Sequence, residues 1–181
     1  MEIADGIWTV ENFLTPEECL EWIGFAENIG FGDAPINVGS GVEMIIDNVR
    51  NNERAMIDDE DKASLLWQRA RKHVPHMIGD YVAIGLNERL RFYRYEQSQK
   101  FAWHADGSFV KSARVRSLLT FMVYLNEDFQ GGETVFVGDR KTEVVPKTGM
   151  MLVFKHEILH EGSIVREGKK YVLRSDIMFC S

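Results

Sequence analysis

Five residues in the C-terminal part of the chain form a motif with metal-binding chemistry. Residues 156–160 read HEILH, which matches the H-E-x-x-H signature of zinc peptidases. In those enzymes the two histidines lie one turn apart on a helix, so both bind the zinc ion. The motif therefore raises a first hypothesis, a zinc hydrolase built on His156, Glu157 and His160.

The residues around this motif are typical of strands. The apolar run MMLVF, residues 150–154, precedes the motif, and Gly162, Ser163 and the β-branched Ile164 and Val165 follow it. In a strand or loop the two histidines need not converge, so we expect at most one of them to bind a metal. No histidine follows the motif to act as a third zinc ligand. We therefore look for another ligand set and keep the zinc hydrolase as an alternative.

A second candidate group lies upstream, in the stretch FAWHADGSF, residues 101–109. On an extended segment His104 and Asp106 project to the same face, so they can take neighbouring positions on one metal ion. His160, 54 residues after Asp106, can complete the set. Two imidazoles and one carboxylate leave three positions open on an octahedral ferrous ion, enough for a chelating cosubstrate and dioxygen. The H-x-D pattern alone is weak, and the order and spacing of the three residues strengthen it.

Two helices are expected in the N-terminal half of the chain. Thr15 is a suitable N-cap, Pro16 fits the first helical position, and Glu18 completes a capping box. Gly30 can end this helix. The spacing of apolar residues predicts a second helix from about residue 60 to residue 73.

After residue 88 the apolar pattern changes from helical spacing to short β runs. Turn residues such as Gly131-Gly132, Gly138-Asp139 and Gly168 separate these runs. Many short strands at this spacing favour a sandwich or barrel of the jelly-roll kind. The expected strands cover residues 91–95, 101–104, 117–125, 133–137, 142–145, 150–154 and 171–179.

Four stretches of this β region resemble a known family. They read RFYRYEQSQKFAWHAD, SLLTFMVYLNEDFQGGETVF, VVPKTGMMLVF and HEGSIVREGKKY, and they lie between about residues 89 and 180. Together they resemble the prolyl 4-hydroxylase type of Fe(II)- and 2-oxoglutarate-dependent dioxygenase. The resemblance implies an α+β, mainly β fold with a double-stranded β-helix (jelly-roll) core. We expect a single domain, residues 1–181, in which residues 1–87 are a helical support region and residues 88–181 are the core.

The resemblance also implies roles for individual residues. The iron ligands of the catalytic centre would be His104, Asp106 and His160. Lys170 would pair with the distal carboxylate of 2-oxoglutarate, because a buried dicarboxylate needs a cation at its far end. Tyr124 matches a tyrosine that hydrogen-bonds the same carboxylate, and Tyr95 matches one that lines the cosubstrate pocket.

One residue of the last expected strand offers a rival for the anchor role. Lys170, Arg174 and Asp176 share one face of this strand. We prefer Lys170 as the anchor on its spacing from His160, although an arginine can bind a carboxylate with two parallel hydrogen bonds. Arg174 would then hold the near carboxylate or an anionic substrate. Its alternative is a structural ion pair with Asp176 or Asp106.

The function that the resemblance implies is hydroxylation of an unactivated C–H bond, with release of succinate and CO₂. The implied cofactors are Fe(II) and the cosubstrate 2-oxoglutarate, and the resemblance leaves a requirement for L-ascorbate open. The partners are then 2-oxoglutarate, dioxygen and a peptide or small molecule. A prolyl hydroxylase and a hydroxylase of small molecules or free amino acids both fit. A jelly-roll module that binds metal without catalysis is the alternative from another class.

The composition restricts the class of protein. A net charge of −7 over 181 residues argues against a nucleic-acid partner, which requires a basic binding surface. The N-terminal stretch MEIADGIWTV lacks the basic start of a signal peptide, and no apolar run is long enough to span a membrane. Cys19 and Cys180 lie far apart and are expected to be free thiols. We therefore expect a cytoplasmic protein without a membrane partner.

The charge is unevenly distributed along the chain. Residues 86–116 hold seven basic residues against Glu88, Glu96 and Asp106, so this stretch is locally positive and can suit an anionic ligand. A solvated charged face explains the same pattern. Likewise, Arg50, Asn52 and Arg54 are interpreted as parts of a charged loop, with a substrate entrance as the alternative.

Overall fold

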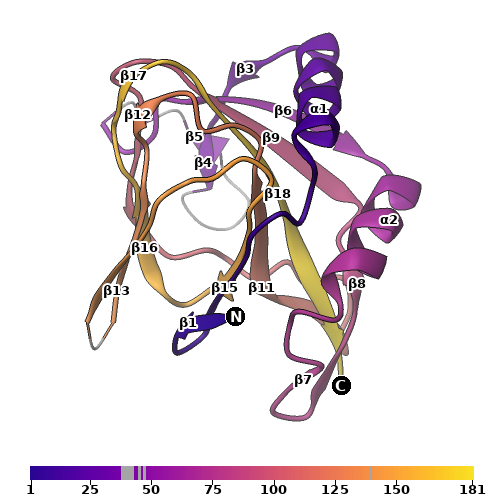
Figure 1. The fold of residues 1–181 in the computed structure, drawn as a ribbon. Coiled ribbons are helices and arrows are strands. Elements are labelled where there is room, and N and C mark those ends of the chain that lie inside the picture. Colours follow the sequence, from indigo (N-terminus) through magenta and orange to yellow (C-terminus); the bar gives the residue numbers. More distant parts are fainter. Residues whose placement is uncertain (38–42, 45, 47, 139) are drawn as a thin grey trace.

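The structure is a computed structural model that describes residues 1–37, 43, 44, 46, 48–138 and 140–181. A ten-stranded sheet forms its main layer, and a smaller sheet of four strands lies on one side of it (Figure 1). Both helices of the described residues lie on the other side (Figure 1). The expected class, α+β and mainly β with a jelly-roll core and N-terminal helices, is confirmed.

The two helices begin where the sequence predicts. Helix α1, Pro16–Ile29, has Thr15 as its N-cap in a full capping box with Glu18, and Gly30 follows its last residue. Helix α2, Glu60–Ala70, is shorter than expected because the chain turns tightly after it, where the His73 amide donates to the Ala70 carbonyl. Among the described residues, no helix combines the length and apolar character needed to cross a lipid bilayer.

The ten-stranded sheet is antiparallel and contains most of the long strands. Its central strands are β11, Val115–Tyr124, and β18, Lys170–Cys180, which pair along most of their lengths. The order along the sheet is β1 (Glu2–Ala4), β2 (Ile7–Val10), β15 (Met151–Lys155), β11, β18, β9 (Arg89–Tyr95), β6 (Glu53–Asp58) and β3 (Gly32–Asp33). Two further strands belong to it, β8 (Tyr81–Leu86), which pairs with the end of β18, and β7 (Met77–Ile78).

The smaller sheet carries the strands next to the candidate metal ligands. Its order is β10 (Phe101–His104), β16 (Leu159–Gly162), β13 (Thr134–Val137) and β14 (Lys141–Val144). Two short pairs complete the described strands, β12 (Gln130–Gly131) with β17 (Val165–Glu167) and β4 (Ile36–Asn37) with β5 (Glu43–Met44). Each of the seven expected strands is present, with ends that differ by at most two residues from the prediction.

Residues 1–87 contain strands as well as the two helices. Strand β2 pairs with β15, and β6 pairs with β9, so this part of the chain extends the main sheet at both edges. The prediction of a helical support region did not include these strands. They are short, and β6 reads ERAMID, which lacks the β-branched runs that mark the later strands. The division into residues 1–87 and 88–181 stays a prediction.

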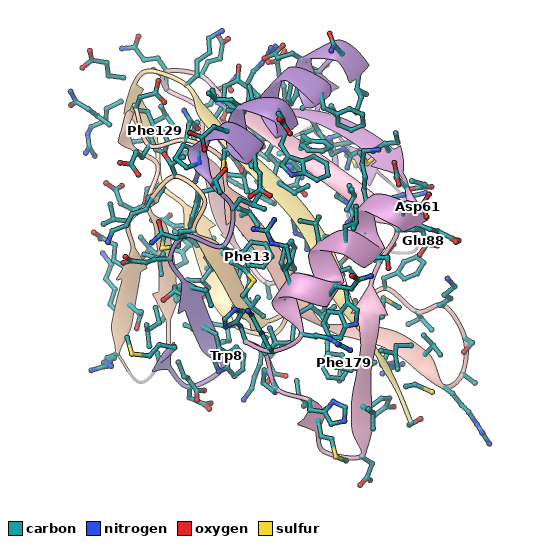
Figure 2. The ribbon with its side chains drawn as sticks, turned by 45° about the vertical axis from the view of Figure 1, so that its right-hand side comes forward. Trp8, Phe13, Asp61, Glu88, Phe129 and Phe179 are labelled. Atoms are coloured by element: carbon teal, nitrogen blue, oxygen red, sulfur yellow. The ribbon has the colours of Figure 1, made fainter. Side chains whose placement is uncertain are left out.

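The apolar core has two parts, one on each side of the main sheet. On the helix side Phe13 lies between α2 and the sheet: its ring packs edge-on against Phe121 at 5.8 Å, and the Arg69 guanidinium lies over it (Figure 2). On the other side a second cluster fills part of the jelly-roll interior, and it includes Tyr93, Tyr95, Tyr124, Phe136 and Phe154. This second cluster forms much of the wall around the candidate site.

Candidate active site

A cavity of about 520 Å³ opens between the two sheets. This volume lies within the range of small-molecule sites, roughly 300–1,000 Å³. Six of the seven residues expected at the site line it: Tyr95, His104, Asp106, His160, Lys170 and Arg174. Tyr124 is fully buried in the wall.

The three candidate metal ligands meet at this cavity. His104 ends β10 and His160 lies on β16, and these two residues are direct cross-strand partners in the antiparallel pair. Asp106 follows two residues after His104, with its amide donating to the His156 carbonyl at 2.9 Å. One ligand atom from each of the three residues lies within 4.8 Å of the others. Strand pairing therefore brings together side chains that are 54 residues apart in the sequence.

The histidine hydrogen bonds suit a bound metal ion. Nδ1 of His104 lies 2.7 Å from the Ala102 carbonyl, and Nδ1 of His160 lies 2.9 Å from the Ile158 carbonyl. A carbonyl oxygen only accepts, so each Nδ1 carries the proton and each Nε2 keeps its lone pair. Both Nε2 atoms lie 3.9 Å from an oxygen of Asp106. Two neutral imidazoles and one carboxylate are a donor set that fits Fe(II).

The charge states agree with this fit. Burial lowers the pKa of His104 to about 4 and also lowers the pKa of His160, so both imidazoles are neutral at physiological pH. Burial alone would raise the pKa of Asp106, but the nearby Arg174 and the two histidines hold it below its ordinary value. The site therefore presents one negative charge and two neutral donors to a cation.

A chain of hydrogen bonds supports Asp106 from behind. The Thr120 hydroxyl donates to Oδ2 of Asp106 at 2.5 Å, and it lies 2.9 Å from Nδ1 of His156. Nε2 of His156 is in turn 2.8 Å from the Ser117 hydroxyl. His156 is thus bonded at both ring nitrogens and lies outside the ligand group of the described residues. The motif HEILH forms a turn and the start of β16, so the helix that the zinc-peptidase geometry requires is absent from residues 156–162.

Lys170 lies at one end of the cavity, at the start of β18. Its side chain is buried, and Nζ donates to the Gly132 carbonyl at 2.7 Å. Nζ also lies 5.1 Å from the ring centroid of Tyr95 and 5.3 Å from that of Tyr124. Burial lowers the pKa of Lys170 to about 7, against a small opposing effect of Glu133. Lys170 makes no salt bridge to a described carboxylate, so it can accept an anionic ligand.

Thr134 is a lining residue that the sequence did not indicate. It belongs to β13, and its hydroxyl is 2.6 Å from the Tyr124 hydroxyl. Thr134 reaches the cavity, while Tyr124 lies behind it. The contact of Tyr124 with 2-oxoglutarate stays a prediction, and Thr134 is a second candidate for it. Only the alternation along β13, which places Thr134 on the same face as Phe136, gives a sequence signal for this role.

Arg174 lies near the metal ligands and away from Lys170. The two residues are four positions apart on the strand, or about 13 Å. Nη2 of Arg174 lies 3.1 Å from Oδ2 of Asp106 and 3.3 Å from Oδ1 of Asp176, and Nη1 of Arg91 lies 3.1 Å from the other oxygen of Asp176. The two arginines and two aspartates therefore form a charge-balanced cluster. The ion pairs expected as the structural alternative for Arg174 are both present, and Arg91 is a member that the sequence did not predict.

Known protein sequences with recognisable similarity cover most of this chain. Residues 90–175 match the family model of the 2OG-Fe(II) oxygenase superfamily. A PKHD-type hydroxylase of Crocosphaera subtropica is 24% identical in an alignment that covers 92% of this chain and 76% of that protein. The match to the family model includes all three candidate metal ligands, Lys170 and Arg174.

Solved structures share the fold. A viral collagen prolyl hydroxylase from Paramecium Bursaria Chlorella virus-1, in complex with 2-oxoglutarate, has a TM-score of 0.67 at 22% identity, and the match covers 99% of this chain and all of that one. A prolyl hydroxylase from Trichoplax adhaerens, in complex with a hypoxia inducible factor peptide, has a TM-score of 0.72 at 16% identity, with 96% and 84% of the chains covered. At these identities the likeness establishes the fold alone.

Proposed function

We propose that this chain, whose residues 90–175 match the family model of the 2OG-Fe(II) oxygenase superfamily, is a dioxygenase that hydroxylates an unactivated C–H bond and releases succinate and CO₂. The observation that carries the proposal is the meeting of two neutral imidazoles and one carboxylate at a cavity with a buried lysine at its other end. This arrangement suits a metal ion and a dicarboxylate together. A metal ion alone would not explain the buried lysine, and a dicarboxylate alone would not explain the cluster of two imidazoles and a carboxylate.

The metal ligands would be His104, Asp106 and His160. Fe(II) and 2-oxoglutarate, when bound, supply the activation of dioxygen and the oxidising power that an unactivated C–H bond requires. The backbone carbonyls of Ala102 and Ile158 fix which ring nitrogen of each histidine faces the ion. The Asp106 carboxylate stays ionised because cationic and polar groups surround it.

The chain would bind the distal carboxylate of 2-oxoglutarate through Lys170. A buried ammonium group without an ionised partner is costly, so an incoming carboxylate stabilises its charged form. The Thr134 hydroxyl and the Tyr95 ring border the same part of the cavity. We infer that Tyr95 and Tyr124 shape this pocket, and that Arg174 keeps Asp106 in place through their ion pair.

For the substrate we propose either a prolyl residue of a peptide or a small molecule such as a free amino acid. The relatives named as prolyl hydroxylases favour a prolyl substrate. A mass increase of one oxygen atom on a proline-containing peptide would support this choice. Hydroxylation of the free amino acid alone would support the other.

One experiment tests the proposed function directly. The protein is mixed with Fe(II) and 2-oxoglutarate without oxygen, and the visible charge-transfer band of the chelate is recorded. Oxygen is then admitted and succinate is measured. We expect His104→Ala, Asp106→Ala and His160→Ala each to lose the band, and His156→Ala to keep it.

The same experiment separates the alternatives. A zinc hydrolase built on HEILH requires His156, so loss of metal binding in His156→Ala with retention in Asp106→Ala would overturn the proposal. A jelly-roll that binds metal without catalysis would give the band but no succinate with any substrate.

Because Cys19 and Cys180 are free thiols, we also propose a reducing compartment, the cytoplasm, which immunofluorescence of the tagged protein can test.

A further inference from the structure

The cavity is far more cationic than the whole molecule. Among the described residues that line the cavity, six are lysine or arginine and two carry a carboxylate, although the net charge of the whole chain is −7. Most of these cations have partners within the protein. Arg89 makes two hydrogen bonds to Asp58, Arg54 is also engaged, and Arg91 and Arg174 balance Asp106 and Asp176. Lys170 and Arg50 are the two remaining cations of this lining, and neither forms an ion pair with a described carboxylate.

Arg50 is buried in an unusual environment for a charged group. Only 6% of the residue is exposed, and its guanidinium lies over two aromatic rings, 4.5 Å from the centroid of Tyr93 and 4.6 Å from that of Phe101. Its Nε donates to Oδ1 of Asn52 at 2.7 Å. Its Nη2 is buried and has no hydrogen-bond partner among the described residues. Arg50 is one of the residues that line the cavity, and a buried guanidinium nitrogen without a partner points to a ligand that supplies one.

The geometry of Arg50 restricts what this ligand can be. The hydrogen bond from Nε to Asn52 and the contacts with the two rings restrict how the guanidinium can move. The terminal nitrogens Nη1 and Nη2 form a planar pair of donors at the end of the side chain. A carboxylate matches this pair with two parallel hydrogen bonds. A phosphate dianion would require additional unpaired cations beside Arg50, which the balanced cluster of Arg91 and Arg174 does not offer.

Arg50 is placed close to the reactive end of the cavity. It forms a β-bridge with Phe101 on the strand that ends in His104. The Phe101 ring stacks on the His104 ring with centroids 3.5 Å apart. A single aromatic ring therefore separates the Arg50 guanidinium from a candidate metal ligand. Lys170, in contrast, begins the strand β18, four positions before Arg174.

We propose that Arg50 binds a carboxylate of the primary substrate, so that the enzyme hydroxylates a carboxylic acid at a carbon near its acid group. The inference rests on the proposed function and gives it a substrate class. Lys170 holds the distal carboxylate of 2-oxoglutarate, and Arg50 holds the carboxylate of the molecule to be oxidised. Free amino acids, their N-acyl derivatives and peptides with a nearby free carboxylate belong to this class.

The test compares acids with their neutral amides. A panel of amino acids and N-acetyl amino acids, each as free acid and as carboxamide, is added to the protein with Fe(II), 2-oxoglutarate and oxygen. Succinate above the rate without additive, and the added oxygen atom, are measured. We expect some acids to stimulate succinate formation at least about tenfold more than their amides. A panel in which no acid exceeds its amide overturns the inference.

Variants of Arg50 show whether this residue causes the preference for acids over their amides. Arg50→Met, which removes the charge and keeps the length, should raise the KM of a stimulating acid at least about tenfold and abolish the preference over its amide. Arg50→Lys keeps the charge without the planar donors and should retain part of the preference. Arg114→Met, at an exposed site outside the cavity, is the matched control. An unchanged preference in Arg50→Met, or a raised KM for 2-oxoglutarate alone, contradicts the assignment.

A binding measurement separates this inference from the proposed function. Acetate and inorganic phosphate are titrated calorimetrically into the protein saturated with 2-oxoglutarate, and into the Arg50→Met and Arg50→Lys variants. We expect acetate to give a heat of binding with the wild type and no heat of binding with Arg50→Met. This result is expected even if no charge-transfer band forms with Fe(II). Phosphate binding in place of acetate overturns the inference. If Arg50→Met does not fold, as judged by its melting curve, Arg50→Lys and the acid-to-amide ratio of the wild type decide.

Discussion

At the scale of single residues, the support of Asp106 is as informative as the ligands themselves. Thr120 donates to the Asp106 oxygen that also faces Arg174, so two groups orient this carboxylate. Groups that orient metal ligands commonly change metal affinity by about 10–100-fold when they are removed. The position of Asp106 is therefore set by β11 and β18 as much as by its own loop.

The first prediction concerns this support. Thr120→Val removes the hydroxyl while keeping the shape, so the protein should fold and the apparent affinity for Fe(II) should fall about 10–100-fold. The measurement is an anaerobic titration of the charge-transfer band with Fe(II) at saturating 2-oxoglutarate. Thr142→Val on β14 is the matched control and should leave the titration unchanged. A wild-type titration in Thr120→Val would mean that this hydrogen bond does not orient Asp106.

The second prediction is the pH dependence caused by Lys170. Its pKa is about 7 in the folded protein, against an ordinary lysine value of 10.5, so the ammonium form is lost as the pH rises above about 7. Because the ammonium form binds the carboxylate, the KM for 2-oxoglutarate should rise up to about tenfold per pH unit above about pH 7. Lys170→Arg, whose side chain stays charged, should lack this rise. The measurement is the KM for 2-oxoglutarate between about pH 6 and pH 9.

The lowered pKa of Lys170 weakens 2-oxoglutarate binding as the pH rises, but it makes the ligand-free protein more stable as the pH rises. Between pH values of about 7 and 10.5, the unfolded chain binds a proton at Lys170 that the folded protein does not. The contribution of Lys170 to the free energy of unfolding therefore increases as the pH rises through this window. The comparison of wild type and Lys170→Met isolates this contribution from those of the other groups. An equal pH slope in both proteins would contradict the shifted pKa.

At the scale of elements, the success of the sequence predictions depends on how local the signals are. The capping box of Thr15 and Glu18 and the final Gly30 act within one helix, and α1 begins and ends where they predict. Strand β6 has no such local signal and is held by its pairing with β9. Helix α2 ends before residue 73 because a tight turn replaces its last expected turn.

The third prediction concerns the turn that leads into β15. Gly149 has φ +75°, and a Cβ atom there would collide with the carbonyl oxygen of Leu14, whose amide donates to the Gly149 carbonyl. Both the backbone conformation and the close approach exclude a side chain, so Gly149→Ala should destabilise the protein by more than about 3 kcal/mol. Gly24→Ala is the control, because Gly24 is helical and a Cβ there meets nothing within 4 Å. This second change should stabilise by about 0.5–1 kcal/mol. Urea denaturation measures both.

At the scale of the whole molecule, the clustering of the three candidate metal ligands was predictable and their surroundings were not. His104 and Asp106 form a local pattern, and the order of the later strands indicates His160. The tertiary structure alone brings Arg50 to the Phe101 ring and Thr120 to Asp106, across 51 and 14 positions respectively. Contacts between residues at such separations leave no periodic signal in one sequence. The sequence alone therefore indicates the ligand set, while the groups that tune it require the fold.

The last prediction follows from the way the ligands join the two sheets. His104 and His160 belong to the four-stranded sheet, while Lys170 and the partners of Asp106 belong to the ten-stranded sheet. A metal ion and a dicarboxylate bound between them should therefore stabilise the whole fold. At ligand concentrations about 100 times the dissociation constant, linkage gives about 2.7 kcal/mol, which raises the melting temperature by roughly 5–10 °C for a chain of this length.

This stabilisation should depend both on the residues proposed to bind the metal and on Lys170. In Asp106→Ala, Fe(II) should no longer raise the melting temperature under argon, because the remaining two imidazoles bind it weakly. In Lys170→Met, Fe(II) alone should still stabilise, but 2-oxoglutarate should add little to it, because its distal carboxylate has lost its cation. Adding a chelator should reverse the increase in the wild type. An equal increase in wild type and Asp106→Ala would place the metal elsewhere on the protein and remove the basis for the ligand set.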